Sequence, residues 1–284
     1  MRRALVLAAL LALCPAAAAR AADPGRWRLV GTTSIPTAYW QGTTSSPDGR
    51  RLYFDGVFAG LFRTDRHLVQ RAGRPVEIPA AVTAKYGFNH IGDITWNRGR
   101  VLLPLECYTA GAPNGGNTCG RGAFAVAEPV TLRWRYLVLL DRRAIAKAMW
   151  AETSPDGRLV WTSSGRDLLA YRSRDVARRH TRPLRPVRRL RRAVPPTGVT
   201  GAVFHRGRLL LAGQRGTDFE VWSVNLATGR RRLEIQRTLH GESEGLDVVR
   251  GVLHWIVTPA DPTGGPPTFP GPRNTLLSFR PVRR

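Results

Sequence analysis

The sequence predicts an all-β fold, a β-propeller of five or six blades. The first observation is a strand-turn-strand unit from Trp40 to Phe54. Its turn, Pro47-Asp48-Gly49, joins a proline of fixed φ to a glycine that accepts positive φ. The second is that similar units return four more times, with turn glycines 44 to 58 residues apart, as in propeller blades. These turn glycines are Gly49, Gly99, Gly157, Gly207 and Gly251.

A further strand follows each unit and completes the evidence for blades. These strands are expected at 61–63, 135–140, 168–171, 219–224 and 275–279. Five units indicate five blades. A sixth, degenerate blade built from 27–35 and the arginine-rich middle of the chain is slightly preferred. The strand that begins at Trp27 is also a candidate to pair with the last blade and close the ring.

Residues 1–22 have the pattern of a secretory signal peptide. Arg2 and Arg3 precede an apolar stretch from Ala4 to Leu13, and small residues follow. That stretch is too short to span a bilayer, and no later run reaches the roughly 20 apolar residues required. We therefore expect a secreted, extracytoplasmic and monomeric protein without a transmembrane segment, in which 23–284 form a single propeller domain.

Cys107 and Cys119 are the cysteines that remain after the signal peptide, and both lie in an expected insertion from Glu106 to Ala127. Exported proteins meet an oxidising environment, which favours disulfides. A metal-binding pair is the alternative, but it lacks a nearby histidine or further cysteine. The sequence predicts a Cys107–Cys119 disulfide.

The formal net charge is +24, and nearly all the positive charge is arginine. Such a basic protein attracts anionic polymers at low salt. The densest run lies between Arg172 and Arg192 and is interrupted by Pro183 and Pro186, which indicates an exposed connection between the third and fourth units. It is either a solvated loop or an anion-binding surface. The candidate anion-binding residues are Arg178, Arg179, Arg188, Arg189, Arg191 and Arg192.

The innermost strand of each blade lines the propeller axis, and polar residues gather on the segments expected to form it. The predicted ligand site in this central channel consists of Gln41, His90, Glu242 and Glu244. A ring of carboxylates also suits Ca²⁺, which takes six to eight oxygen ligands. The candidate metal ligands are Asp93, Glu152, Glu242, Glu244 and Asp247. His90 is the candidate general base. The alternative is that these groups satisfy backbone groups and ordered water.

Two features resemble the blade starts of secreted six-bladed propellers. They are the Ser-Pro-Asp-Gly-Arg turns at 46–50 and 154–158, and Gly245-Leu246-Asp247 after Glu244. That group includes the gluconolactonase and strictosidine-synthase-like superfamily and the esterase-like phytase-type proteins. The calcium-dependent lactonases among them imply a channel cation held by acids at the blade starts. This sequence departs from that pattern, with Gln41 in place of an acid and no asparagine near Thr200. It looks closer to uncharacterised secreted propellers.

The sequence contains no Gly-rich phosphate loop or His-Glu-x-x-His motif. We therefore expect an exported binding or interaction module that takes an unspecified small molecule or extracellular protein in its channel. One alternative is a calcium-dependent hydrolase of lactones or esters in the same channel. The other is an anion-binding surface protein that uses the arginine-rich segment.

Overall fold

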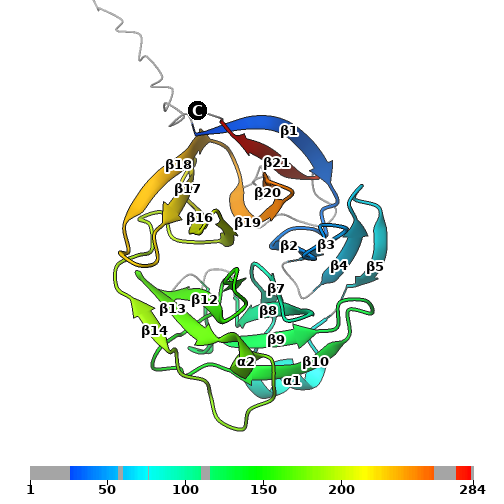
Figure 1. Cartoon of the computed structure of the whole chain (residues 1–284). Coiled ribbons are helices and arrows are strands. Elements are labelled where there is room, and N and C mark those ends of the chain that lie inside the picture. The colour runs from blue at the N-terminus through cyan, green and yellow to red at the C-terminus, as the bar shows by residue number, and fades with distance from the viewer. Residues whose placement is uncertain (1–25, 57–59, 76, 110–115, 259–272, 283–284) are drawn as a thin grey trace, which may run out of the picture.

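The computed structural model describes residues 26–56, 60–75, 77–109, 116–258 and 273–282. These residues form five small β-sheets arranged as a ring around a central axis, which is a five-bladed β-propeller (Figure 1). Neighbouring strands within each sheet pair antiparallel, with the innermost strand at one edge. The predicted fold class is confirmed.

The first three blades follow one another along the chain. The first contains β2 (Thr43–Ser45), β3 (Arg51–Asp55), β4 (Leu61–Asp65) and β5 (Gln70–Arg74). After α1 (Ala80–Tyr86), the second contains β6 (His90–Ile91), β7 (Thr95–Asn97), β8 (Arg100–Glu106), β9 (Ala123–Ala127) and β10 (Trp134–Leu139). The third contains β11 (Glu152–Thr153), β12 (Leu159–Ser164), β13 (Asp167–Arg172), α2 (Ser173–Val176) and β14 (Arg188–Leu190).

The last two blades bring the two ends of the propeller together. The fourth contains β15 (Gly201–His205), β16 (Arg208–Arg215), β17 (Asp218–Val224) and β18 (Arg231–Thr238). The fifth contains β19 (Glu242–Val249), β20 (Val252–Thr258), β21 (Asn274–Pro281) and β1 (Trp27–Ile35). β1 pairs with β21 from Trp27 opposite Pro281 to Ile35 opposite Asn274, which confirms the predicted closing strand.

The slight preference for six blades is wrong, and strand pairing gives the reason. The two segments assigned to a sixth blade are the outermost strands of other blades. β1 completes the fifth sheet, and β14, from the arginine-rich segment, completes the third. Neither segment has a partner strand left over, so the described residues close the ring with five sheets.

The five predicted hairpin turns are confirmed by the backbone. Each turn glycine has positive φ, between 63° and 78°. Glycine adopts such angles without strain, whereas most other residues are strained by them. The insertion of the second blade is shorter than expected, because 123–127 form β9, a fully buried strand. The predicted Cys107–Cys119 disulfide is present, with Cα atoms 5.6 Å apart.

The core lies between neighbouring sheets. Between the fourth and fifth blades, for example, fully buried Phe219 and Trp255 pack with ring centroids 5.9 Å apart, and Phe279 follows on β21. Burying aromatic rings of this size removes a large apolar area from water, so the blades are held together by packing between the sheets.

Among the described residues, no helix is long and apolar enough to cross a membrane. The predicted signal peptide (1–22) lies outside the described residues. Export therefore stays a prediction, and the disulfide is consistent with it.

Candidate functional site

The innermost strands β2, β7, β11, β15 and β19 contact one another around the axis. Their backbones approach so closely at three glycines that no side chain would fit. A Cβ on Gly201 would lie 2.5 Å from the carbonyl oxygen of Glu244, and one on Gly245 would lie 2.7 Å from Cα of Gly42. The propeller axis is therefore closed at this level, and the predicted continuous channel is interrupted.

The side chain of Asp93 completes this closure. Its Oδ1 accepts a hydrogen bond from the backbone N–H of Thr43 at 3.0 Å, and its Oδ2 accepts one from Ala202 at 2.8 Å. Burial raises the pKa of Asp93 well above its ordinary value, while these N–H donors oppose the shift. Asp93 thus joins the first, second and fourth blades, as expected of a buried polar group that satisfies backbone donors.

The closure divides the predicted site residues between two ends of the axis. The hairpin end lies where the β2–β3, β7–β8, β11–β12, β15–β16 and β19–β20 turns are. The loop end lies where the chain enters each innermost strand. Glu152 and Asp247 lie toward the hairpin end, and Gln41, His90 and Glu242 lie at the loop end. The structure therefore does not bring all the predicted residues together.

A cavity of about 550 Å³ opens at the hairpin end, and we call it the axial cavity. All five blades contribute to its wall, so it lies on the propeller axis. Its lining includes Thr44, Ser45, Thr95, Trp96, Glu152, Thr153, Val203, Phe204, Asp247 and Arg250. Concave sites of this size with a few convergent polar groups are the usual form of small-molecule sites.

Glu152 reaches the cavity from the third blade and bonds to both neighbouring blades. Its Oε2 accepts a hydrogen bond from the Thr95 hydroxyl at 2.7 Å, and its Oε1 accepts one from the N–H of Phe204 at 3.0 Å. Burial raises the pKa of Glu152 to about 8, the charge of Asp247 adds to the rise, and the two donors oppose it. Near neutral pH this acid is therefore largely protonated.

Asp247 enters the same cavity from the fifth blade. Its Oδ1 accepts a hydrogen bond from the N–H of Val248 at 2.8 Å. Its Oδ2 is buried, and a side-chain hydrogen bond from Ser45 to the carboxyl group opposes the rise of its pKa. Burial raises the pKa of Asp247 to about 7. The cavity therefore holds two carboxyl groups whose pKa values lie near neutral pH.

The loop end contains two buried polar pairs. Gln41 Nε2 donates a 2.8 Å hydrogen bond to Glu244 Oε2. His90 Nδ1 lies 2.9 Å from Glu106 Oε1, and Lys147 Nζ lies 3.9 Å from Glu106 Oε2. The role of His90 as a general base stays a prediction, because its nearest acid is a buried partner on the neighbouring strand.

Further acids lie close to the loop end. Burial raises the pKa of Glu244 well above its ordinary value, and the charges of Glu242 and Asp55 add to this rise. Burial also raises the pKa of Asp55, an acid that the sequence reasoning missed, and the charge of Asp93 adds to it. Glu242 itself is exposed.

No group of three His, Cys, Asp or Glu side chains within the described ranges is arranged to hold a metal ion. The predicted ligands Asp93, Glu152, Glu242, Glu244 and Asp247 are divided by the closed axis, and Asp93 bonds backbone N–H groups on both oxygens. The predicted calcium ion therefore has no support from the geometry.

Most predicted anion-binding arginines already have partners. Arg178 pairs with Asp175 at 3.1 Å, and Arg189 pairs with Asp167 at 2.7 Å. Arg179 and Arg188 donate to the backbone carbonyls of Arg135 and Leu226. The side chains of Arg191 and Arg192 are exposed at the end of β14. Most arginines of this segment therefore make ion pairs or hydrogen bonds with residues of the blades.

Sequence reasoning missed the aromatic side of the axial cavity, Trp96 and Phe204. A signal for them was present. Each stands three residues before a turn glycine, Gly99 or Gly207, as Ser46 stands three residues before Gly49. Aligning the five units on these glycines places the three side chains at the same level of the axis, beside the hairpin turns.

Comparisons with known proteins add information on the fold. No protein-family model matches the sequence. A search of curated proteins likewise finds no match. Among solved structures, glutaminyl cyclase from Myxococcus xanthus is similar with a TM-score of 0.57 and 10% identity, over 90% of this chain and 97% of that one.

Two further similar structures are longer than this chain. The GH43 protein BlXynB from Bacillus licheniformis has a TM-score of 0.56 and 9% identity, over 89% of this chain and 55% of that one. An exo-β-1,3-galactanase from Phanerochaete chrysosporium has a TM-score of 0.56 and 11% identity, over 91% and 64% respectively. At such low identity these likenesses concern the fold alone, and they agree with a β-propeller.

Proposed function

We propose that this protein is an extracytoplasmic binding module that takes a small polyhydroxylated molecule, such as the end of a neutral oligosaccharide, in its axial cavity. The observation that carries the proposal is the convergence of Glu152 and Asp247 in one cavity lined by all five blades. Within the described residues, the calcium-dependent hydrolase has no group of three metal-ligating side chains, and most arginines proposed for anion binding are paired.

The chemistry of the wall supports a hydroxylated ligand over a cation. A protonated carboxyl group donates one hydrogen bond and accepts others, so it matches a hydroxyl group, which does the same. Thr44, Ser45 and Thr153 add hydroxyl groups to the wall, and Arg250 adds a positive charge that disfavours cations. Trp96 and Phe204 add apolar faces. One similar structure, the exo-β-1,3-galactanase, is a complex with β-1,3-galactotriose, which makes neutral sugars a reasonable first panel.

Saturation-transfer NMR with neutral mono-, di- and trisaccharides, β-1,3-galactotriose among them, tests the proposal. We expect a signal from at least one sugar, lost in the variant E152Q/D247N. That variant keeps the size of both side chains and changes their hydrogen-bonding pattern. D218N, at an exposed position of β17, is the matched control and should keep the signal. A panel without any signal, or equal signals from all three proteins, contradicts the proposal.

A second candidate function, acid–base hydrolysis of an ester or lactone in the same cavity, is favoured by the proton exchange of this acid pair near neutral pH. General acids and bases work best when their pKa lies near the working pH. We expect hydrolysis of p-nitrophenyl acetate or gluconolactone to fall in both E152Q and D247N. Activity that survives in both variants rejects this function. If activity is lost in a third variant, H90A, and in neither of the other two, the hydrolytic site lies at the loop end.

A further inference from the structure

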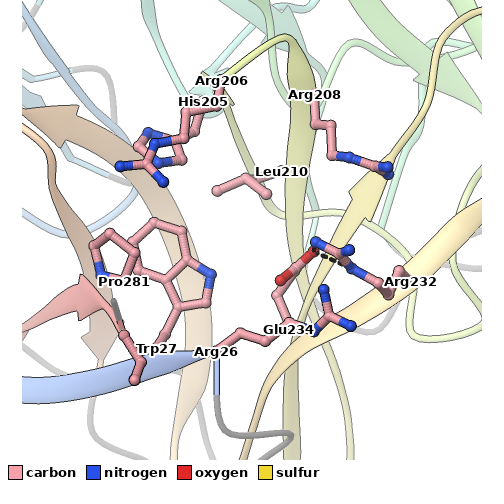
Figure 2. A pocket seen from close by; sticks show the side chains of 10 residues that line it. Arg26, Trp27, His205, Arg206, Arg208, Leu210, Arg232, Glu234 and Pro281 are labelled. Atoms are coloured by element: carbon pink, nitrogen blue, oxygen red, sulfur yellow. Dashed lines mark hydrogen bonds and ion pairs between the residues drawn. The ribbon is translucent and has the colours of Figure 1, made fainter. Parts of the chain in front are cut away.

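A second cavity, of about 600 Å³, lies at the junction where the ring closes (Figure 2). Its wall comes from β1 and the end of β21 in the fifth blade, and from β15, β16 and β18 in the fourth. It shares no lining residue with the axial cavity. We call it the arginine pocket, because its lining includes Arg26, Arg206, Arg208 and Arg232.

The positive charge of this pocket is largely uncompensated. Its single lining acid, Glu234, is paired with Arg232, whose Nε donates to Oε1 at 2.8 Å. Within the described ranges, the guanidinium groups of Arg26, Arg206 and Arg208 make no hydrogen bond or ion pair, although the backbone carbonyl of Arg26 accepts a hydrogen bond from the N–H of Val282. In the arginine-rich segment, by contrast, most arginines are paired. Three unpaired guanidinium groups around one cavity repel one another, and a bound anion would remove that cost.

An apolar floor lies between these charges. Figure 2 shows Leu210 between Arg206 with His205 on one side and Arg208 on the other, and the Trp27 indole beside it. The rings of Trp27 and His205 are 5.1 Å apart between centroids. This floor suits a ligand that has an apolar ring in addition to its charge.

His205 supplies a further polar atom. Its Nε2 is buried and has no hydrogen bond with a described residue. Burial lowers the pKa of His205, and the charge of Arg206 lowers it further, so the imidazole is neutral near pH 7. A neutral imidazole protonated on Nε2 is a hydrogen-bond donor to an oxyanion.

We propose that the arginine pocket binds a small molecule in which a phosphate or sulfate monoester is attached to a ring. Arg26, Arg206 and Arg208 bind the oxyanion, since planar guanidinium groups match its geometry with paired hydrogen bonds. The ring packs on the floor formed by Trp27 and Leu210. The pocket is open to solvent, and its volume of about 600 Å³ lies in the range of small-molecule sites, which favours such a ligand.

Isothermal titration calorimetry with phenyl phosphate, phenyl sulfate and inorganic phosphate tests this proposal. We expect saturable binding of phenyl phosphate or phenyl sulfate, and the tighter of the two identifies the charged group. Inorganic phosphate should bind more weakly, because it leaves the apolar floor uncovered. The variant R206Q/R208Q should weaken binding about tenfold or more, the effect of losing charge-assisted hydrogen bonds.

The matched control is R191Q/R192Q, which removes the same charge from the exposed end of β14. It should bind within about twofold of the unaltered protein. R26Q changes a residue that precedes β1 and provides an independent variant if R206Q/R208Q alters folding. Equal weakening by the two double variants would show non-specific attraction to net charge and overturn the proposal. Absence of saturable binding by both phenyl esters would also overturn it.

Discussion

The carboxylate of Asp93 on the second blade accepts a 2.8 Å hydrogen bond from the backbone N–H of Ala202 on the fourth blade, across the propeller axis. Its other oxygen accepts one from Thr43 on the first blade. Three blades that are distant in sequence are thus held by one side chain. The contact explains why this acid, a candidate metal ligand by sequence, has a structural role.

We predict that D93N destabilises the protein by about 1–3 kcal/mol, because the amide nitrogen cannot accept a hydrogen bond and one buried N–H loses its partner. Urea unfolding followed by tryptophan fluorescence measures the change. D218N makes the same chemical change at an exposed position and should alter stability by less than about 0.5 kcal/mol. Equal effects of the two substitutions would show that Asp93 does not join the blades.

Closure of the axis by backbone contact gives a second prediction. G92A and G201A should lower stability severely, by about 3 kcal/mol or more. A Cβ on Gly201 would overlap the backbone of Glu244, and one on Gly92 would overlap the carbonyl of Met149. Thermal unfolding measures the loss. G31A is the control, since its nearest neighbour would be 3.8 Å away. If G201A melted at the same temperature as G31A, the axis would be open.

The acid pair in the axial cavity predicts a pH dependence of stability. The pKa of Glu152 rises from 4.5 to about 8 on folding. Between these values the folded state binds more protons than the unfolded state, so stability falls as pH increases. Glutamine does not titrate, so the free energy of unfolding of E152Q should not fall in this way. Between pH 5 and pH 9 the stability of E152Q relative to the unaltered protein should therefore increase by a few kcal/mol. Urea unfolding at several pH values measures it, and parallel curves would contradict the predicted shift.

The disulfide gives a prediction that is independent of any site. Cys107 and Cys119 are 12 residues apart, and closing a loop of this length stabilises the folded state by about 3 kcal/mol. A reductant should therefore lower the melting temperature of the unaltered protein and leave that of C107S/C119S unchanged. A reductant effect of equal size on both proteins would contradict this.

Much of the fold could be predicted because it depends on local patterns. A glycine with positive φ between two apolar segments specifies a hairpin, and Gly49, Gly99 and Gly157 each did so. The closing strand at Trp27 was also predictable, since it needs only a partner at the other end of the chain. The blade count could not be predicted, because it depends on which sheets β1 and β14 join as outermost strands. That choice is made by pairing across the fold.

The site was only partly predictable for a similar reason. Sequence position indicated that Glu152, Asp247 and His90 approach the axis. It did not indicate that glycine contacts at Gly201 close the axis between them. Nor did it indicate the arginine pocket, whose lining comes from strands at opposite ends of the chain. Both features arise from the packing of blades against each other.

The most direct test of the central claim, ligand binding in the axial cavity, is a crystal structure of the protein with the sugar that gives the strongest saturation-transfer signal. The predicted result is a sugar in the axial cavity, with a hydroxyl group within hydrogen-bond distance of Asp247 Oδ2 and a ring beside Trp96 or Phe204. A sugar bound at the loop end beside Gln41 and His90, or on the outer surface, would contradict the claim.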